Sequence, residues 1–131
     1  MQTPKDVVVL SDSEGAQLLT ERLTPKAGAV ACYANVEDLI HGQSLASIAV
    51  LVVQAGPQPQ GVLLATLGRM NVEYPAMQKV AVMKEAPSLP IARYMAACGV
   101  DLIWTGSQDE SIDQLAAVVD RMYARTTWIV S

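Results

Sequence analysis

The 131-residue chain contains no phenylalanine, only two cysteines and a single histidine. Without phenylalanine, the core of a folded chain must be filled by valine, leucine, isoleucine, alanine and methionine. Hydrophobic residues make up 51% of the sequence and charged residues only 17%, which is typical of a globular protein and not of a disordered one. The length suits one domain with a substantial core. We therefore expect a single domain over residues 1–131, with its core over about 6–123.

Two isolated cysteines are too few for a disulfide framework or a metal site. Cys32 and Cys98 both have apolar neighbours in the sequence, so we expect two buried thiols in a protein of the reducing cytoplasm. His41 forms no recognisable catalytic pair with either cysteine, and it stands near the end of a predicted helix. There the helix dipole favours it as a surface residue. We predict no metal and no cofactor.

Signals for a nucleic acid or a membrane partner are also missing. The net charge is −4 and no run of lysines and arginines occurs, so a nucleic-acid surface within this domain is not expected. The longest apolar run ends at Val53 and is too short to span a bilayer. The N-terminus passes directly into a strand-like run, without the apolar stretch of a signal peptide. The sequence thus favours a cytoplasmic protein.

Short β-rich runs alternate with segments of helical periodicity along the chain. Strands are predicted over 6–11, 27–34, 47–54, 78–85 and 100–106, each followed by a helical segment. Alternation of this kind implies parallel strands joined by right-handed crossovers, and five units are too few for an eightfold barrel. The sequence therefore predicts an α/β fold, a three-layer α/β/α sandwich of the flavodoxin-like (βα)5 type with strand order 2-1-3-4-5.

Local signals place several helix ends. Asn35 is a candidate N-cap and Gly42 a candidate stop for one helix, and Ser88 and Gly99 have these roles in a later one. In the last helix, expected over 109–124, one apolar face is formed by Ile112, Leu115, Ala116, Val119 and Tyr123. Residues 124–131 are expected to form a tail or the start of a linker to a further domain.

Two strand ends mark the expected functional edge. In a sheet of this order, ligands bind at the carboxyl ends of strands one and three. These ends are Ser11–Asp12 and Gln54–Ala55.

From about Asp6 to Tyr123 the chain resembles the receiver domains of bacterial two-component response regulators, the CheY-like superfamily. The resemblance rests on element order and on the passages "VVVLSD", "VLVVQAGPQPQGVLL" and "YMAACGVDLIWT". In that family, acidic residues after strand one and an aspartate ending strand three hold Mg²⁺. That aspartate accepts the phosphoryl group, which a Ser/Thr after strand four and a lysine after strand five contact. The resemblance implies a receiver-like domain of signal transduction.

The family's functional positions fall on Ser11, Asp12, Gln54, Lys84 and about Gly106, and only Asp12 matches. Gln54 is a neutral amide that cannot form an acyl phosphate, and one carboxylate with one amide makes a poor Mg²⁺ site. We therefore expect a degenerate pseudo-receiver that is neither phosphorylated nor an enzyme. Lys84 is expected either to pair with Asp12 in the vacated pocket or to be a solvated loop residue.

The last helix carries more apolar residues than one buried face needs. Val118 and Met122 lie outside that face, and Tyr94 and Trp104 are expected to flank the same edge. Trp128, in the tail, would be costly to expose. These residues predict a homodimer interface, or a contact with an output domain or a regulatory protein. Val118 and Met122 can equally be boundary residues.

Three functions remain open on the sequence. The first is a regulatory protein-interaction module, the N-terminal domain of a longer regulator. The second is a small-molecule sensor whose ligand lies between Asp12, Gln54 and Lys84. The third is a phosphoacceptor that still works through Asp12 or another acid.

Overall fold

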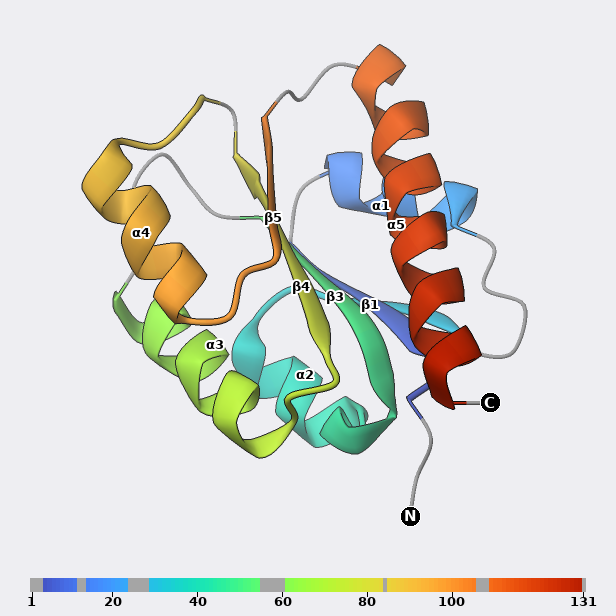
Figure 1. Cartoon of the computed structure of the whole chain (residues 1–131). Coiled ribbons are helices and arrows are strands. Elements are labelled where there is room, and N and C mark those ends of the chain that lie inside the picture. The colour runs from blue at the N-terminus through green and yellow to red at the C-terminus, as the bar shows by residue number, and fades with distance from the viewer. Residues whose placement is uncertain are drawn as a thin grey trace.

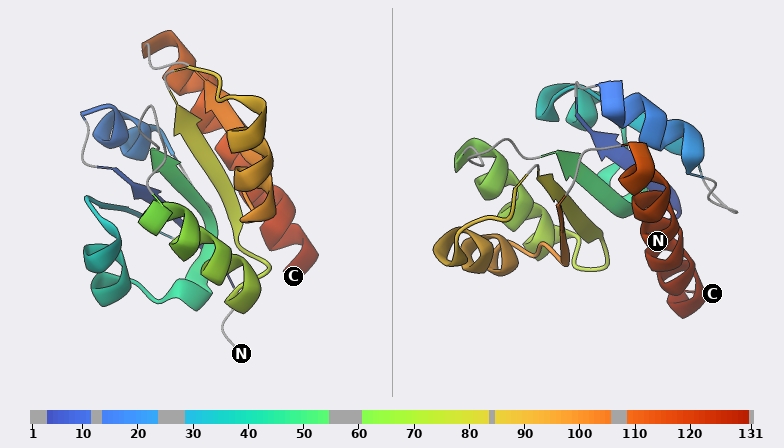
Figure 2. Two further views of the ribbon diagram at one scale, coloured as in Figure 1. Left: turned by 90° about the vertical axis from the view of Figure 1, so that its left-hand side faces the viewer. Right: turned by 90° about the horizontal axis from the view of Figure 1, so that it is seen from above.

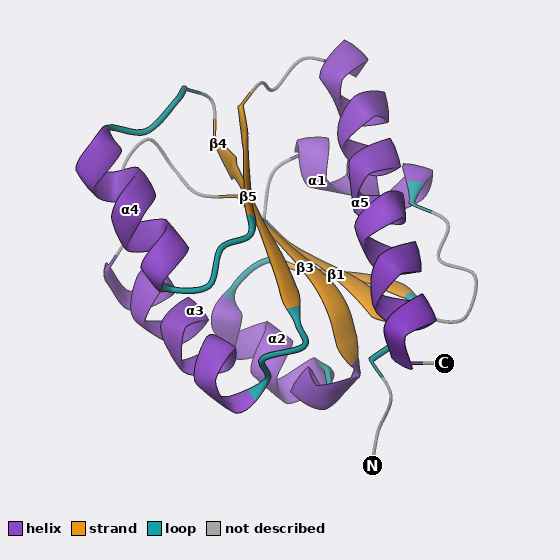
Figure 3. Cartoon of the chain, in the orientation of Figure 1, coloured by secondary structure: helices purple, strands orange, loops and turns teal. Residues whose placement is uncertain are grey.

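Strands and helices alternate along the chain in the computed structural model (Figures 1 and 3). The structure describes residues 4–11, 14–23, 29–54, 61–83, 85–105 and 109–130. Within these ranges, the side chains of residues 14–16, 61–62, 109–111 and 126–130 are not described. The strands are β1 (Asp6–Leu10), β2 (Val30–Tyr33), β3 (Ile48–Gln54), β4 (Gln78–Met83) and β5 (Leu102–Thr105). The helices are α1 (Glu14–Arg22), α2 (Val36–Gly42), α3 (Gly61–Glu73), α4 (Leu89–Ala97) and α5 (Asp109–Val130), with a short 3-10 turn over Leu45–Ser47.

The strands form one parallel sheet in the order β2-β1-β3-β4-β5, which confirms the predicted topology. β3 lies at its centre. All its residues from Ile48 to Val53 are buried, because helices cover both faces of this strand. β2 and β5 are the edge strands, and their side chains are half-buried or exposed.

Alternating side chains divide the core between the two faces of the sheet. Val7 and Val9 belong to the cluster that α1 and α5 cover. Val8 and Leu10 belong to the cluster on the opposite face, beneath α2, α3 and α4. Figure 2 shows the resulting three layers, and the predicted sandwich is therefore confirmed.

The element ends differ from the prediction at several places. β2 begins at Val30, β4 ends at Met83 and β5 begins at Leu102, so these three strands are shorter than expected. α5 is longer, since it continues to Val130 where a tail was expected after about residue 124. The segment after Tyr123 contains neither glycine nor proline, so nothing in it stops a helix. Trp128 lies within α5, and its side chain is outside the described residues.

The helix-end signals are confirmed in part. Asn35 caps α2, with its Oδ1 accepting a hydrogen bond of 2.8 Å from the Asp38 N–H. Gly42 is the last residue within α2 and Gln43 is the C-cap, so the prediction of Gly42 as the residue that follows the C-cap is wrong by two positions. Ser88 stands at the N-cap position of α4 but makes no capping bond with its side chain. Gly99 ends the α4 turn at φ +88°, a left-handed conformation that favours glycine.

The two cysteines differ in exposure. Cys98 is buried as expected, but Cys32 is exposed, so the prediction of two buried thiols is wrong for Cys32. It lies on the edge strand β2, which has a neighbouring strand on one side only, and none of the four residues of this strand is fully buried. His41 is exposed in the last turn of α2, as predicted. In the described part of the chain, no helix combines the length and apolarity required to cross a membrane.

Candidate functional site at the carboxyl edge of the sheet

The ends of β1 and β3 bring two predicted site residues together. Leu10 pairs with Val53 in the parallel register, so the next residues, Ser11 and Gln54, are neighbours. The Ser11 hydroxyl donates a hydrogen bond to Gln54 Oε1. The Ser11 backbone N–H donates to the Tyr33 carbonyl at 2.9 Å, which continues the β1–β2 pairing past the strand end. Ser11 is half-buried and Gln54 is exposed.

This pair is uncharged. An aspartyl nucleophile requires a carboxylate, and a serine hydroxyl with a carboxamide supplies none. Mg²⁺ prefers hard oxygen ligands that include carboxylates. Among the residues that the structure describes, no three His, Cys, Asp or Glu side chains gather closely enough to hold a metal ion.

The other predicted pocket residues, Asp12, Lys84 and Gly106, lie outside the described residues. The Asp12–Lys84 ion pair therefore stays a prediction.

Cys32 adds a thiol beside this edge that the sequence reasoning did not place there. Its Sγ lies 3.7 Å from the Ser11 carbonyl oxygen, in the geometry of a weak S–H···O hydrogen bond. The predicted strand order could have indicated this position, because the order 2-1-3-4-5 makes β2, which carries Cys32, an edge strand next to β1.

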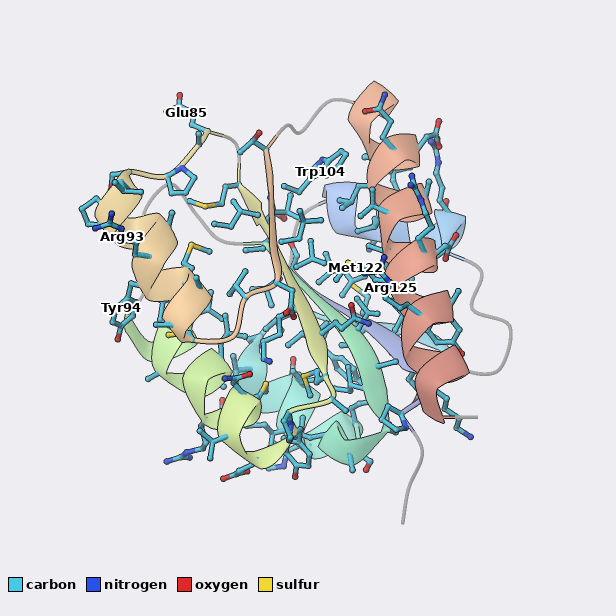
Figure 4. All side chains as sticks on the ribbon, viewed as in Figure 1. Glu85, Arg93, Tyr94, Trp104, Met122 and Arg125 are labelled. Atoms are coloured by element: carbon cyan, nitrogen blue, oxygen red, sulfur yellow. The ribbon has the colours of Figure 1, made fainter. Side chains whose placement is uncertain are left out.

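The predicted interface residues fall into two groups. Trp104 and Met122 are half-buried against the cluster beneath α1 and α5, and Val118, also half-buried, precedes Met122 by one turn of α5. Tyr94 is 55% exposed on α4, which covers the opposite face of the sheet. Figure 4 shows Trp104 and Met122 between β5 and α5, with Tyr94 on the outer side of α4. The structure thus does not place Tyr94 at the edge that Trp104 occupies.

The sequence reasoning missed a buried lysine at the opposite, amino end of the sheet. The side chain of Lys79 is only 1% exposed, and its Nζ donates to the Met77 carbonyl at 3.2 Å. Its backbone N–H donates to Asp101 Oδ2 at 2.9 Å. Burial lowers the pKa of Lys79, and the nearby Asp101 carboxylate opposes this effect. The sequence could have indicated this burial, because alternate residues of a strand face the same side of the sheet. Lys79 faces the same side of β4 as Ala81 and Met83, which are buried.

Comparison with solved structures shows the receiver fold. A response regulator from Thermotoga maritima matches with a TM-score of 0.68 and 15% identity, over 93% of this chain and 98% of that chain. A phosphorylated cyanobacterial phytochrome response regulator matches with a TM-score of 0.72 and 11% identity, over 95% and 96%. A putative pilus assembly protein from Burkholderia thailandensis matches with a TM-score of 0.67 and 13% identity, over 91% and 98%.

No protein-family model matches the chain, and neither does any curated protein sequence. At these identities the likeness establishes the architecture alone, which is the fold of response-regulator receiver domains.

Proposed function

We propose that this chain is a receiver-like regulatory module that acts through protein contacts and is not controlled by phosphorylation. The observation that carries the proposal is the hydrogen bond between Ser11 and Gln54. It places a neutral hydroxyl–amide pair at the two strand ends where a receiver needs carboxylates. The module is therefore not an enzyme and not a phosphoacceptor.

A regulatory role without phosphorylation is in keeping with the range of proteins that have this fold. The similar structures include a phosphorylated response regulator and a putative pilus assembly protein. The same architecture thus occurs under different functional descriptions, and function has to be argued from the site. We place the module at the N-terminus of a longer cytoplasmic regulator, whose output it would control by docking.

The docking surface that we propose is the strip between β5 and α5. It consists of Trp104 from β5 with Val118 and Met122 from α5, all half-buried at the margin of the core. An apolar strip of this kind can be covered by a second copy of the chain or by an output domain or regulatory protein. Tyr94 offers a separate apolar position on α4.

Acetyl phosphate tests the proposal. The protein is incubated with Mg²⁺ and acetyl phosphate, and its intact mass is measured, with an authentic receiver as a positive control. We expect no phosphoryl adduct on this chain while the control is labelled. A stable adduct that depends on Mg²⁺ would disprove the proposal and would favour a phosphoacceptor acting through Asp12 or another acid.

A small-molecule sensor is the alternative at the same edge. The exposure of Gln54 and of the Cys32 thiol next to Ser11 would let a ligand reach polar groups there. A thermal-shift screen of small polar metabolites distinguishes the two functions. A saturable rise in melting temperature that Gln54→Ala abolishes would favour the sensor over the docking module.

A further inference from the structure

Lys79 is a charged side chain enclosed within the core. It ranks among the fully buried side chains of the protein, with 1% of its surface exposed. The acceptor of its Nζ is a single carbonyl, that of Met77. A buried ammonium is costly unless a carboxylate and further hydrogen bonds compensate for its lost hydration.

The available carboxylate compensates only in part. Asp101 lies directly before β5, is exposed to solvent, and uses its Oδ2 to accept the backbone N–H of Lys79. The Lys79 carbonyl in turn accepts the Asp101 N–H at 2.9 Å. The two residues are thus joined through backbone groups, and their side chains, both of which the structure describes, form no ion pair with each other.

The α3 and α4 layer covers the face on which Lys79 lies. Ala81 and Met83, which share its parity on β4, belong to the core cluster beneath this layer. Figures 1 and 2 show α3 and α4 side by side over this part of the sheet. Water can reach the Lys79 amine only if this cover or the adjoining loops move, because the side chain is sealed in the closed arrangement.

α4 is the less firmly anchored part of that cover. Of its nine residues only Met95 is buried, and the cap residue Cys98 adds a second buried side chain. Leu89 and Tyr94 are 62% and 55% exposed. Helices with few buried apolar contacts open at lower free energy than the rest of a fold.

We propose that Lys79 is a built-in destabilising element that makes α4 open readily, because opening returns its enclosed amine to water. When α4 is packed on the sheet, the protein has the free-energy cost of burying the Lys79 amine. When α4 is open, this cost is absent. The domain therefore opens at low free energy on the α4 side of the sheet, while α1 and α5 stay packed on the other face. The inference does not depend on the proposed docking function or on the absence of phosphorylation.

Native-state hydrogen exchange of the intact chain tests this proposal. Lys79→Met keeps the length of the side chain and removes the charge. We expect the α4-side amides of Ala92, Cys98 and Val100, which are hydrogen-bonded in the structure, to exchange at least about tenfold more slowly in this variant. The amide of Leu23 makes a hydrogen bond at the end of α1 on the other face, where it can exchange by local opening that leaves Lys79 buried. Its exchange should therefore change by less than about threefold.

The exposed lysine Lys5 supplies the matched control, and Lys5→Met should leave all four amides unchanged. Unchanged or faster exchange of the α4-side amides in Lys79→Met would overturn the proposal. Equal slowing at Leu23 would overturn it too, because the effect of Lys79 would then not be confined to openings on the α4 side. Loss of folded protein in Lys79→Met would also contradict it, since an apolar residue of matching length should stabilise the closed arrangement.

Discussion

Ser11 donates a hydrogen bond to Gln54 across the carboxyl ends of the adjacent strands β1 and β3. In a receiver-type sheet this is the place where phosphoryl chemistry requires negative charge and a bound cation. Here a serine hydroxyl and a carboxamide occupy the two strand ends and are hydrogen-bonded to each other. A hydroxyl and a carboxamide can hydrogen-bond to each other without a metal ion, and this is the physical basis of the proposed function.

Restoring the missing carboxylate alone should not restore chemistry. We predict that Gln54→Asp takes up no phosphoryl group from acetyl phosphate and Mg²⁺, because Ser11 supplies no second acid and the strand-five lysine is missing from the sequence after Thr105. The intact mass checks this. Labelling of the single variant above the level of the unmodified protein would show that the pocket is closer to a working receiver than we propose.

Lys79 should make stability depend on pH in the alkaline range. Burial lowers its pKa in the folded state below the ordinary lysine value of 10.5, and the Asp101 carboxylate only partly offsets this. Below the lowered pKa both states are protonated and the destabilisation is complete. As the pH rises from the lowered pKa towards 10.5, the folded state releases its proton first, so the free energy of unfolding rises.

Urea unfolding at a series of pH values measures this effect. The difference between Lys79→Met and the unmodified protein should be ~1–4 kcal/mol in favour of the variant near neutral pH and should shrink as the pH approaches 10.5. All other titratable groups are common to both proteins and cancel in the difference. A difference that does not change with pH would show that charge is not the cause.

Gly99 and Gly68 form a matched pair for testing the α3–α4 junction. Gly99 has φ +88°, and a Cβ there would approach the Asn71 side chain to less than 3.0 Å. Gly99→Ala should therefore lower the free energy of unfolding by at least ~1 kcal/mol. Gly68 lies within α3, and the nearest atom to an added Cβ is the Cys98 Sγ at 3.8 Å, an ordinary contact.

Gly68→Ala is accordingly expected to stabilise the protein by up to ~1 kcal/mol through helix propensity. Chemical unfolding of both variants decides the matter. Equal effects of the same sign would mean that the junction is not packed as the structure has it.

Charge placed in the β5–α5 strip should interfere with docking. If a second copy covers the strip, the protein should sediment as a dimer at micromolar concentration, and Val118→Glu or Met122→Glu should convert it to a monomer. Ala117→Glu, at an exposed position of the same helix, is the control and should leave the dimer intact. A dimer that survives both strip variants uses another surface, and a monomeric parent protein leaves an output domain or regulatory protein as the partner.

The sequence predicted the topology because β-rich runs and helical periodicities alternate without interruption, and the buried face of α5 followed from spacing alone. Predictions from the sequence were wrong about burial and about neighbouring residues where these depend on the position of a strand in the sheet more than on local composition. Cys32 has apolar neighbours in sequence but is exposed on an edge strand, and Tyr94 is close to Trp104 in sequence but on the other side of the sheet. Lys79 escaped notice because a lysine is normally assigned to the surface, although the alternation of β4 indicates its inward direction.

A beryllofluoride titration followed by backbone NMR tests most directly whether the Ser11–Gln54 edge lacks phosphoryl chemistry. Beryllofluoride with Mg²⁺ mimics an acyl phosphate only where an acceptor carboxylate and a metal site are present. We expect no saturable shift of the Ser11, Gln54 or Thr105 amides up to millimolar concentrations. Saturable, Mg²⁺-dependent shifts at these amides would contradict it.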